Sequence, residues 1–186
     1  MTIGFALCGS FCTYAQVFPV MEELAKEHNV IPIFSFAAAS IDSRFGKAEE
    51  HLARAEAICG RSPFTTIEEV EPIGPRKLLD ALVIAPCTGN TLAKLSHSIA
   101  DTPVTMAAKS HLRNGRPVLV TVSTNDALAG AAENIGRLLA RKHYYFVPFG
   151  QDNAAAKPTS MVADFKKIPQ ALVSAMEGKQ IQPIIL

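Results

Sequence analysis

The stretch ALVIAPCTGNTLAKLSHSIAD, residues 81–101, passes from an apolar run through a small polar turn into a helical pattern. Its first five residues have strand length and are apolar on both faces, which predicts a strand buried between two layers. Pro86 ends this run, and the turn 87–91 carries two hydroxyls, an amide and a glycine. A strand, a turn and a helix in this order predict one unit of a parallel α/β sheet.

The rest of the chain repeats this alternation. Apolar runs predict further strands at 2–7, 30–36, 117–122 and 144–147. Helical spacing of apolar residues predicts helices at 13–28, 47–59, 90–100, 102–112 and 164–176, and another that is capped by Asn125 and Asp126 and runs to Arg141. We therefore expect a three-layer α/β/α fold with a Rossmann-like parallel sheet. A length of 186 residues suggests a single domain over 1–186.

Composition excludes several function classes. A net charge of +1 gives no electrostatic footprint for nucleic acid or a membrane surface. No apolar run approaches the roughly 18 residues of a membrane span. The start, MTIGFALCG, resembles a strand and lacks the features of a signal peptide. The four cysteines match no metal-binding spacing, so we expect reduced thiols in a cytoplasmic protein without a metal site.

Small polar residues follow four of the predicted strands, where the carboxyl ends of parallel strands would meet at one edge of the sheet. Hydroxyls and backbone N–H groups at helix N-termini bind phosphate. Any one of these loops could be only a helix cap, but their agreement favours a ligand cradle. The candidates for cofactor binding are Gly9, Ser10, Phe11, Ser35, Thr88, Gly89, Asn90, Thr91 and Ser123. Because CGSFCT is not a GxGxxG turn, a mononucleotide fits this cradle better than NAD.

The segment PCTGNTLAKLSHSIAD, residues 86–101, resembles the PASANT motif of the flavin-dependent cysteine decarboxylase superfamily. Pro86, Asn90 and Thr91 match the motif, and Thr88 stands for its serine. The tail HYYFVPFGQDNAAAKP is similar in layout to that of the flavin prenyltransferases of the same fold. The resemblance implies a flavoprotein-type fold, FMN as the cofactor, and a homo-oligomer, either a trimer or a dodecamer.

Departures from these enzymes argue against their reactions. The catalytic histidine of the decarboxylases falls at Pro72, which can neither shuttle a proton nor donate a hydrogen bond. Of their substrate clamp, a Pro-x-Met-Asn-x-x-Met-Trp pattern, only Asn125 remains. The Arg-Glu pair of the prenyltransferases is absent from the same segment. Decarboxylation and flavin prenylation are therefore disfavoured, whereas the ligand cradle is retained.

Nearly the whole chain is similar to the B subunits of dipicolinate synthase, a flavoprotein-fold family of spore-forming bacteria. The segments that carry this resemblance include ALCGSFCTYAQVFPVMEEL, SRFG, RNGRPVLVTVSTNDAL and KPTSMVA. The resemblance implies an oxidoreductase subunit that takes part in the oxidation of dihydrodipicolinate to dipicolinate during sporulation. It also implies a partner, the dehydrogenase-like A subunit, which would carry NAD(P).

Several residues are candidates for chemistry on a dicarboxylate substrate. Asn125 could orient a substrate carboxylate or a flavin carbonyl, or could cap a helix. Asp126 would be a general base only in a desolvated site, and is otherwise a helix cap. Arg44 is the first candidate to bind a substrate carboxylate. Cys12 could be reactive near a helix N-terminus, although a packed thiol is favoured, and Cys87 has no assigned role.

Two questions stay open. All five histidines are expected in solvated or helix-capping positions. They are His28, His51, His97, His111 and His143. For the function, the sequence leaves three alternatives, which are an oxidoreductase subunit, a non-catalytic flavin-fold scaffold for the A subunit, and a flavin-dependent decarboxylase. The third is disfavoured by Pro72.

Overall fold

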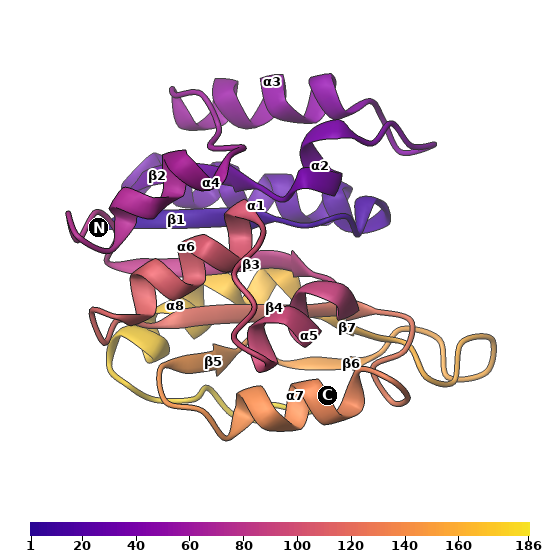
Figure 1. The fold of residues 1–186 in the computed structure, drawn as a ribbon. Coiled ribbons are helices and arrows are strands. Elements are labelled where there is room, and N and C mark those ends of the chain that lie inside the picture. The colour runs from indigo at the N-terminus through magenta and orange to yellow at the C-terminus, as the bar shows by residue number, and fades with distance from the viewer.

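The computed structural model describes residues 1–186, and its centre is a mostly parallel β-sheet (Figure 1). Five parallel strands follow one another across the sheet in the order β2 (Asn29–Phe34), β1 (Thr2–Leu7), β3 (Ala81–Cys87), β4 (Val118–Thr124) and β5 (Tyr144–Phe146). The chain thus leaves β1 toward one side of the sheet and returns on its other side at β3. This change of direction creates a crevice beyond the carboxyl ends of β1 and β3.

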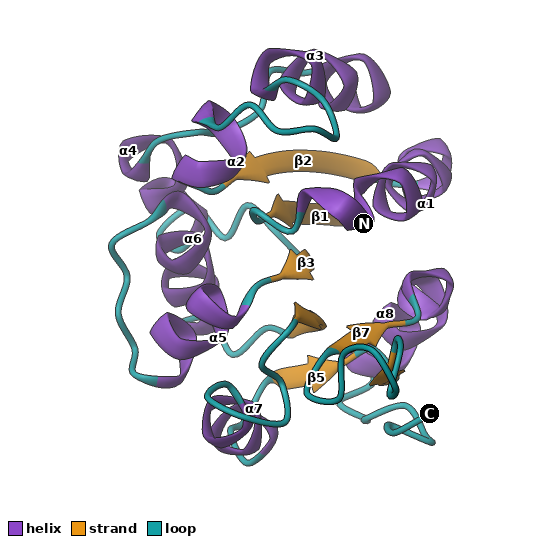
Figure 2. Ribbon diagram, turned by 90° about the vertical axis from the view of Figure 1, so that its right-hand side faces the viewer, coloured by secondary structure: helices purple, strands orange, loops and turns teal.

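Helices cover both faces of this sheet, which confirms the three-layer α/β/α prediction (Figure 2). One face carries α4 (Ile67–Val70), α5 (Gly89–Ser96), α6 (Pro103–Leu112) and α7 (Ala132–Leu139). The other face carries α1 (Tyr14–Glu27) and α8 (Ile168–Met176), while α2 (Phe36–Ser40) and α3 (Ala48–Cys59) lie beside β2. Short 3-10 turns complete the chain at Phe11–Thr13, Glu71–Ile73 and Phe165–Lys167. None of the helices combines the length and the apolar character needed to cross a membrane.

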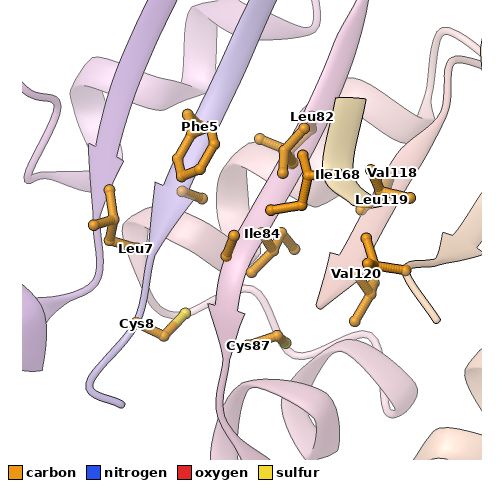
Figure 3. Close-up of a cluster of buried hydrophobic side chains, with 14 of the residues drawn as sticks. Phe5, Leu7, Cys8, Leu82, Ile84, Cys87, Val118, Leu119, Val120 and Ile168 are labelled. Atoms are coloured by element: carbon orange, nitrogen blue, oxygen red, sulfur yellow. The ribbon is translucent and has the colours of Figure 1, made fainter. Parts of the chain in front are cut away.

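Both faces of the central strand are buried, as its apolar run predicts. All seven residues of β3 are buried, and neighbouring strands contribute Phe5, Leu7 and Val120 to the same cluster (Figure 3). The core contains 49 buried residues, which extend along the chain from Ile3 to Ile181. These residues form one continuous core.

The β3 strand continues through Pro86 to Cys87, two residues beyond its predicted end. Pro86 has no backbone N–H, so it cannot donate to the ladder with β4. The register shifts between Ile84 and Cys87, and Cys87 pairs again with Val122. The proline therefore marks an irregularity within the strand and not its end.

The helix predicted to begin at Asn125 does not begin there. Residues 125–131 form turns, in which the Asp126 carbonyl oxygen accepts hydrogen bonds from the N–H groups of Ala129 and Ala131 at 2.9 and 3.0 Å. The helix α7 starts at Ala132, and its N-cap, Ala131, offers no side-chain cap. The prediction that Asn125 and Asp126 cap this helix is wrong.

A second feature that the sequence did not predict is an antiparallel hairpin after β5. Strand β6 (Phe149–Gln151) pairs with β7 (Met161–Ala163), and β7 pairs with Ser123 and Thr124 at the end of β4. Three-residue strands are too short to show the alternation from which strands are predicted. The sheet is therefore parallel at its centre, with an antiparallel extension at its carboxyl edge.

Two histidines are buried, whereas solvated or capping positions were expected for them. His51 is 8% exposed and His111 is fully buried. The His111 Nε2 donates to the Pro117 carbonyl oxygen at 3.1 Å, and its Nδ1 has no partner. Burial lowers the pKa of His111 to about 4, so the ring is neutral at pH 7.

This burial predicts acid sensitivity of the fold. The unfolded chain binds a proton at His111 below a pKa of 6.5, whereas the folded chain does so only below about 4. The contribution of neutral His111 to the free energy of unfolding is therefore fully present well above pH 6.5. It is lost as the pH decreases toward 4, and the loss reaches about 3 kcal/mol. Burial also lowers the pKa of His51, which adds in the same direction. We expect urea unfolding between pH 7 and 5 to show this slope.

The variant His111→Gln should reduce the slope, because its amide does not titrate. The variant His97→Gln, at an exposed position, is the control and should keep the wild-type slope. Equal slopes in all three proteins would contradict the assignment to His111.

Candidate functional site

A cavity of about 690 Å³ lies at the carboxyl edge of the sheet, beside the crevice between β1 and β3. The loops after β1, β3 and β4 contribute to it, together with the turn before α3 and the loop between β6 and β7. Its lining contains Gly9, Ser10, Phe11, Cys12, Thr13, Gln16, Ser43, Arg44, Phe45, Thr88, Ser123, Thr124, Asn125, Asp152, Lys157, Ser160 and Val162. The cavity thus gathers predicted residues from segments far apart in the sequence.

Hydroxyl groups from three loops line this cavity. The Oγ atoms of Ser10 and Ser123 lie 2.7 Å apart and share a hydrogen bond, which joins the loops after β1 and β4. Thr88 is the N-cap of α5, and its Oγ1 accepts from the Thr91 N–H at 3.3 Å. Because the first N–H groups of a helix have no partner within it, the beginning of α5 presents donors beside these hydroxyls.

The start of α5 packs closely on the loop after β4. A Cβ atom on Gly89 would lie 2.8 Å from the Thr124 Oγ1 and 2.9 Å from the Asp126 Oδ1. The absence of a side chain therefore lets this helix end approach the neighbouring loop.

Positive charge predominates around the cavity. Lys157 pairs with Asp152 at 3.1 Å, and the guanidinium of Arg44 forms no ion pair with any carboxylate. The Ser160 hydroxyl, followed by the Lys157 ammonium, lowers the pKa of Asp152. Ser160 also donates to the Asn125 Oδ1 at 3.4 Å. The two cations and one carboxylate leave a net charge that favours an anionic ligand.

Some predicted binding residues serve the surrounding structure and do not line the cavity. The Ser35 hydroxyl caps α2 by accepting from the Ala38 N–H. Thr91 is buried and donates to the Cys8 Sγ at 3.3 Å, which ties α5 to the end of β1. Gly89 and Asn90 also lie outside the lining.

Asp126 does not meet the condition for a general base. Its carboxylate is exposed, accepts from the Thr124 hydroxyl and does not line the cavity. A base in this position would need desolvation, which an exposed carboxylate lacks.

The loop between β6 and β7 lines part of the cavity, a contribution that the sequence did not predict. This loop provides Asp152, Lys157 and Ser160 to the cavity wall. The available signal was the stretch QDNAAAKP, which lies in the tail that resembles the flavin prenyltransferases. Only the antiparallel pairing of β7 with β4 brings this loop beside the other strand ends, and the sequence pattern does not show that pairing.

The cysteines divide into buried and exposed thiols. Burial raises the pKa of Cys8 to about 11 and that of Cys87 above its usual value, and Figure 3 shows both on the neighbouring strand ends. Both thiols are buried, and burial favours their neutral form over the reactive thiolate. Cys12 is exposed and lines the cavity, so the expectation of a packed thiol there is wrong. No cluster of three histidine, cysteine or carboxylate side chains could hold a metal ion.

A second cavity, of about 400 Å³, lies between α5, α6 and the start of β5. Its lining includes Lys109, Arg141 and Tyr144, and none of the predicted site residues. The larger cavity at the carboxyl edge is therefore the candidate site.

The Ser10–Ser123 hydrogen bond predicts energetic coupling across the site. Ser123 is 4% exposed, so Ser10→Ala leaves its hydroxyl without a partner and should destabilise the fold by about 1 kcal/mol. Because Ser123→Ala breaks the same bond, the double variant should be about as stable as either single variant. Urea unfolding measures the cycle, and Ser40→Ala on α2 is the control for loss of a solvent-exposed serine hydroxyl. If the losses in the free energy of unfolding of the two single variants add up in the double variant, the two serines are not coupled.

Known proteins share this architecture. The flavoprotein family model matches residues 1–172. The chain is 45% identical over 185 residues to the B subunit of dipicolinate synthase from Bacillus subtilis (strain 168), and the match covers 99% of this chain and 92% of that protein. The crystal structure of the dipicolinate synthase B subunit from Bacillus halodurans C superposes with a TM-score of 0.91 at 42% identity, covering 100% of this chain and 95% of that one.

More distant structures share the fold alone. The FMN-dependent cysteine decarboxylase SpaF has a TM-score of 0.66 at 22% identity and covers 94% of this chain and 97% of its own. Burkholderia xenovorans DmrB in complex with FMN has a TM-score of 0.68 at 18% identity, with 95% of each chain covered. From the match of the family model and the full-length similarity, the chain belongs to the flavoprotein family and, within it, to the dipicolinate synthase B-subunit group.

Proposed function

We propose that this chain acts as the B subunit of a dipicolinate synthase. It takes part, with a dehydrogenase-like A subunit, in the oxidation of dihydrodipicolinate to dipicolinate during sporulation. Full-length similarity to a protein of that name supports the assignment. The observation that carries it is the cavity at the carboxyl edge, where hydroxyls and unpaired positive charge converge.

The residues of the cavity fit FMN. A phosphate needs several donors, and Ser10, Thr88 and Ser123 supply hydroxyls next to the N-terminus of α5. Lys157 adds a cation at the same wall. A volume of about 690 Å³ lies within the roughly 300–1,000 Å³ typical of ligand pockets. When bound, FMN supplies an acceptor for two electrons.

The chemistry of the reaction divides naturally between binding and electron transfer. Aromatisation of the dihydropyridine ring removes a hydride equivalent and one proton. In this chain, Arg44 binds a substrate carboxylate and the Asn125 amide orients the substrate by hydrogen bonding. The hydride acceptor is FMN on this chain or the nicotinamide, NAD(P), on the A subunit.

One observation favours the second candidate, a non-catalytic scaffold. The cavity contains no histidine, and its only carboxylate, Asp152, is paired with Lys157. A proton acceptor for ring oxidation is therefore not evident among its lining residues. A decarboxylase remains disfavoured, because Pro72 lies in the 3-10 turn Glu71–Ile73 and does not line the cavity.

Assembly with copies of the same chain is also part of the proposal. Phe36 is 47% exposed and Ile41 is 48% exposed, and both lie near the carboxyl edge of the sheet. Apolar side chains in such positions favour a homo-oligomer, a trimer or a dodecamer. All four cysteines are free, which supports a cytoplasmic location.

Flavin binding is tested by titration of the purified chain with FMN. We expect a yellow complex and quenched flavin fluorescence. The variant Lys157→Gln should weaken FMN binding by about tenfold, because it removes a charge-assisted contact worth about 1.4 kcal/mol. Lys179→Gln is the matched control, since Lys179 also pairs with a carboxylate, Glu177, at 3.0 Å but lies outside the cavity. Equal losses in the two variants would show that Lys157 does not contact the ligand.

Reconstitution from purified subunits tests whether dipicolinate formation needs both this chain and the A subunit. Dipicolinate is measured by its ultraviolet absorbance with this chain alone, with the A subunit alone and with both. We expect turnover only with both chains, and Asn125→Ala should lower it while leaving complex formation intact. Unchanged turnover of Asn125→Ala would favour the scaffold candidate. Full turnover by this chain alone would refute the need for a partner.

A further inference from the structure

A smaller cavity, of about 130 Å³, adjoins the larger one and is not explained by flavin binding. The two cavities share Phe11, Cys12 and Phe45 in their walls. The smaller one is otherwise lined by Tyr14, Ala15, Phe18, His51 and Arg54, from α1 and α3. It is therefore an aromatic recess with a few polar groups, next to the candidate cofactor site.

His51 is a buried polar group of this recess, and its ring lacks a hydrogen-bond partner. Its side chain is 92% buried and forms no hydrogen bond, and its Nε2 is shielded from solvent. The imidazole packs edge-on against the Tyr14 ring, with 4.8 Å between the ring centres, and is stacked on the Phe18 ring, with 5.9 Å between the centres. Burial lowers the pKa of His51, so the imidazole is neutral and offers one donor and one acceptor. Buried polar groups in folded proteins are usually satisfied, which makes a ligand contact the natural use of this ring.

Two arginines stand beside the recess without a carboxylate partner. The Arg54 guanidinium lies 4.5 Å from the centre of the Phe18 ring, and that of Arg44 lies 4.9 Å from the centre of the Phe45 ring. The nearby Glu50 carboxylate accepts from the Lys47 N–H and pairs with neither arginine. Stacking on aromatic rings holds both guanidinium planes in place while leaving their N–H donors free.

A tight turn places Phe45 in the wall that the two cavities share and Arg44 in the wall of the larger cavity beside it. The backbone groups of Ser43 and Gly46 bond to each other at 3.0 and 3.2 Å, with Arg44 and Phe45 at the tip of the turn. Gly46 has a φ of +129°, and a Cβ atom there would lie 2.8 Å from the His51 Cε1. Glycine is required here because the turn backbone packs directly on the imidazole.

We propose that this recess is the subsite for the ring of a planar pyridine or dihydropyridine dicarboxylate. Arg44 and Arg54 bind its two carboxylates, the aromatic walls enclose the ring, and His51 supplies a polar contact. The substrate class rests on the proposed function, whereas the recess and its two unpaired cations are features of this chain. The site places a bound dianion directly beside the larger cavity, where an electron acceptor would lie.

Binding of pyridine-2,6-dicarboxylate to the purified chain tests the subsite. Calorimetry in metal-free buffer should detect binding, and the monoacid pyridine-2-carboxylate should bind at least tenfold more weakly. Arg44→Gln and Arg54→Gln should each weaken binding of the diacid at least tenfold. Arg76→Gln is the control, because Arg76 is an exposed arginine outside both cavities. All three positions are exposed, and thermal unfolding checks that the variants fold.

The outcomes separate the subsite from the proposed function. With the A subunit present, Arg54→Gln should raise the KM for dihydrodipicolinate much more than it lowers kcat. Diacid binding that is unchanged in both arginine variants overturns the subsite and leaves the proposed function standing. Absence of dipicolinate formation by the wild-type pair overturns the proposed function, and the binding measurements then still decide whether the recess holds a dicarboxylate.

Discussion

The parallel pairing of β1 with β3 is the interaction on which the candidate site depends. Because β2 lies on the other side of β1, the chain must leave β1 and β3 in different directions, and their carboxyl ends flank a crevice. The hydrogen bond from Thr91 to the Cys8 sulfur fixes the beginning of α5 against β1. The Ser10–Ser123 bond then adds β4 to the same edge. Side chains from distant parts of the sequence thereby line one cavity.

The motif that resembles the decarboxylases has two roles in this arrangement. Thr91 faces inward and secures the turn, and Gly89 permits close packing against the loop after β4. Only Thr88, from this turn, lines the cavity. The polar cluster between strand and helix therefore first satisfies the backbone at the start of α5, and one of its hydroxyls, on Thr88, faces the cavity.

Much of the fold could be predicted because local patterns determine it. The apolar run of β3 and the helical spacing in α1 follow directly from burial on two faces and on one face. Lining residues of the cavity were named in advance at the ends of such strands, as at Ser10 and Ser123. Two other features depend on tertiary contacts and were not predicted. The β6–β7 hairpin is too short to show a pattern, and the burial of His51 depends on a turn at Gly46. The spacing of residue types along the sequence does not predict such tertiary contacts.

The hairpin that supplies Lys157 has a further consequence. Two paired strands of three residues are too short to be stable alone. The hairpin is held on one side by the end of β4 and on the other by the chain's last residues, since Phe149 exchanges backbone hydrogen bonds with Ile184 and Leu186. The wall of the cavity thus derives its order from a tail that contributes no side chain to the lining. Any fusion or tag that displaces this tail would disturb the wall of the cavity without altering a single residue of its lining.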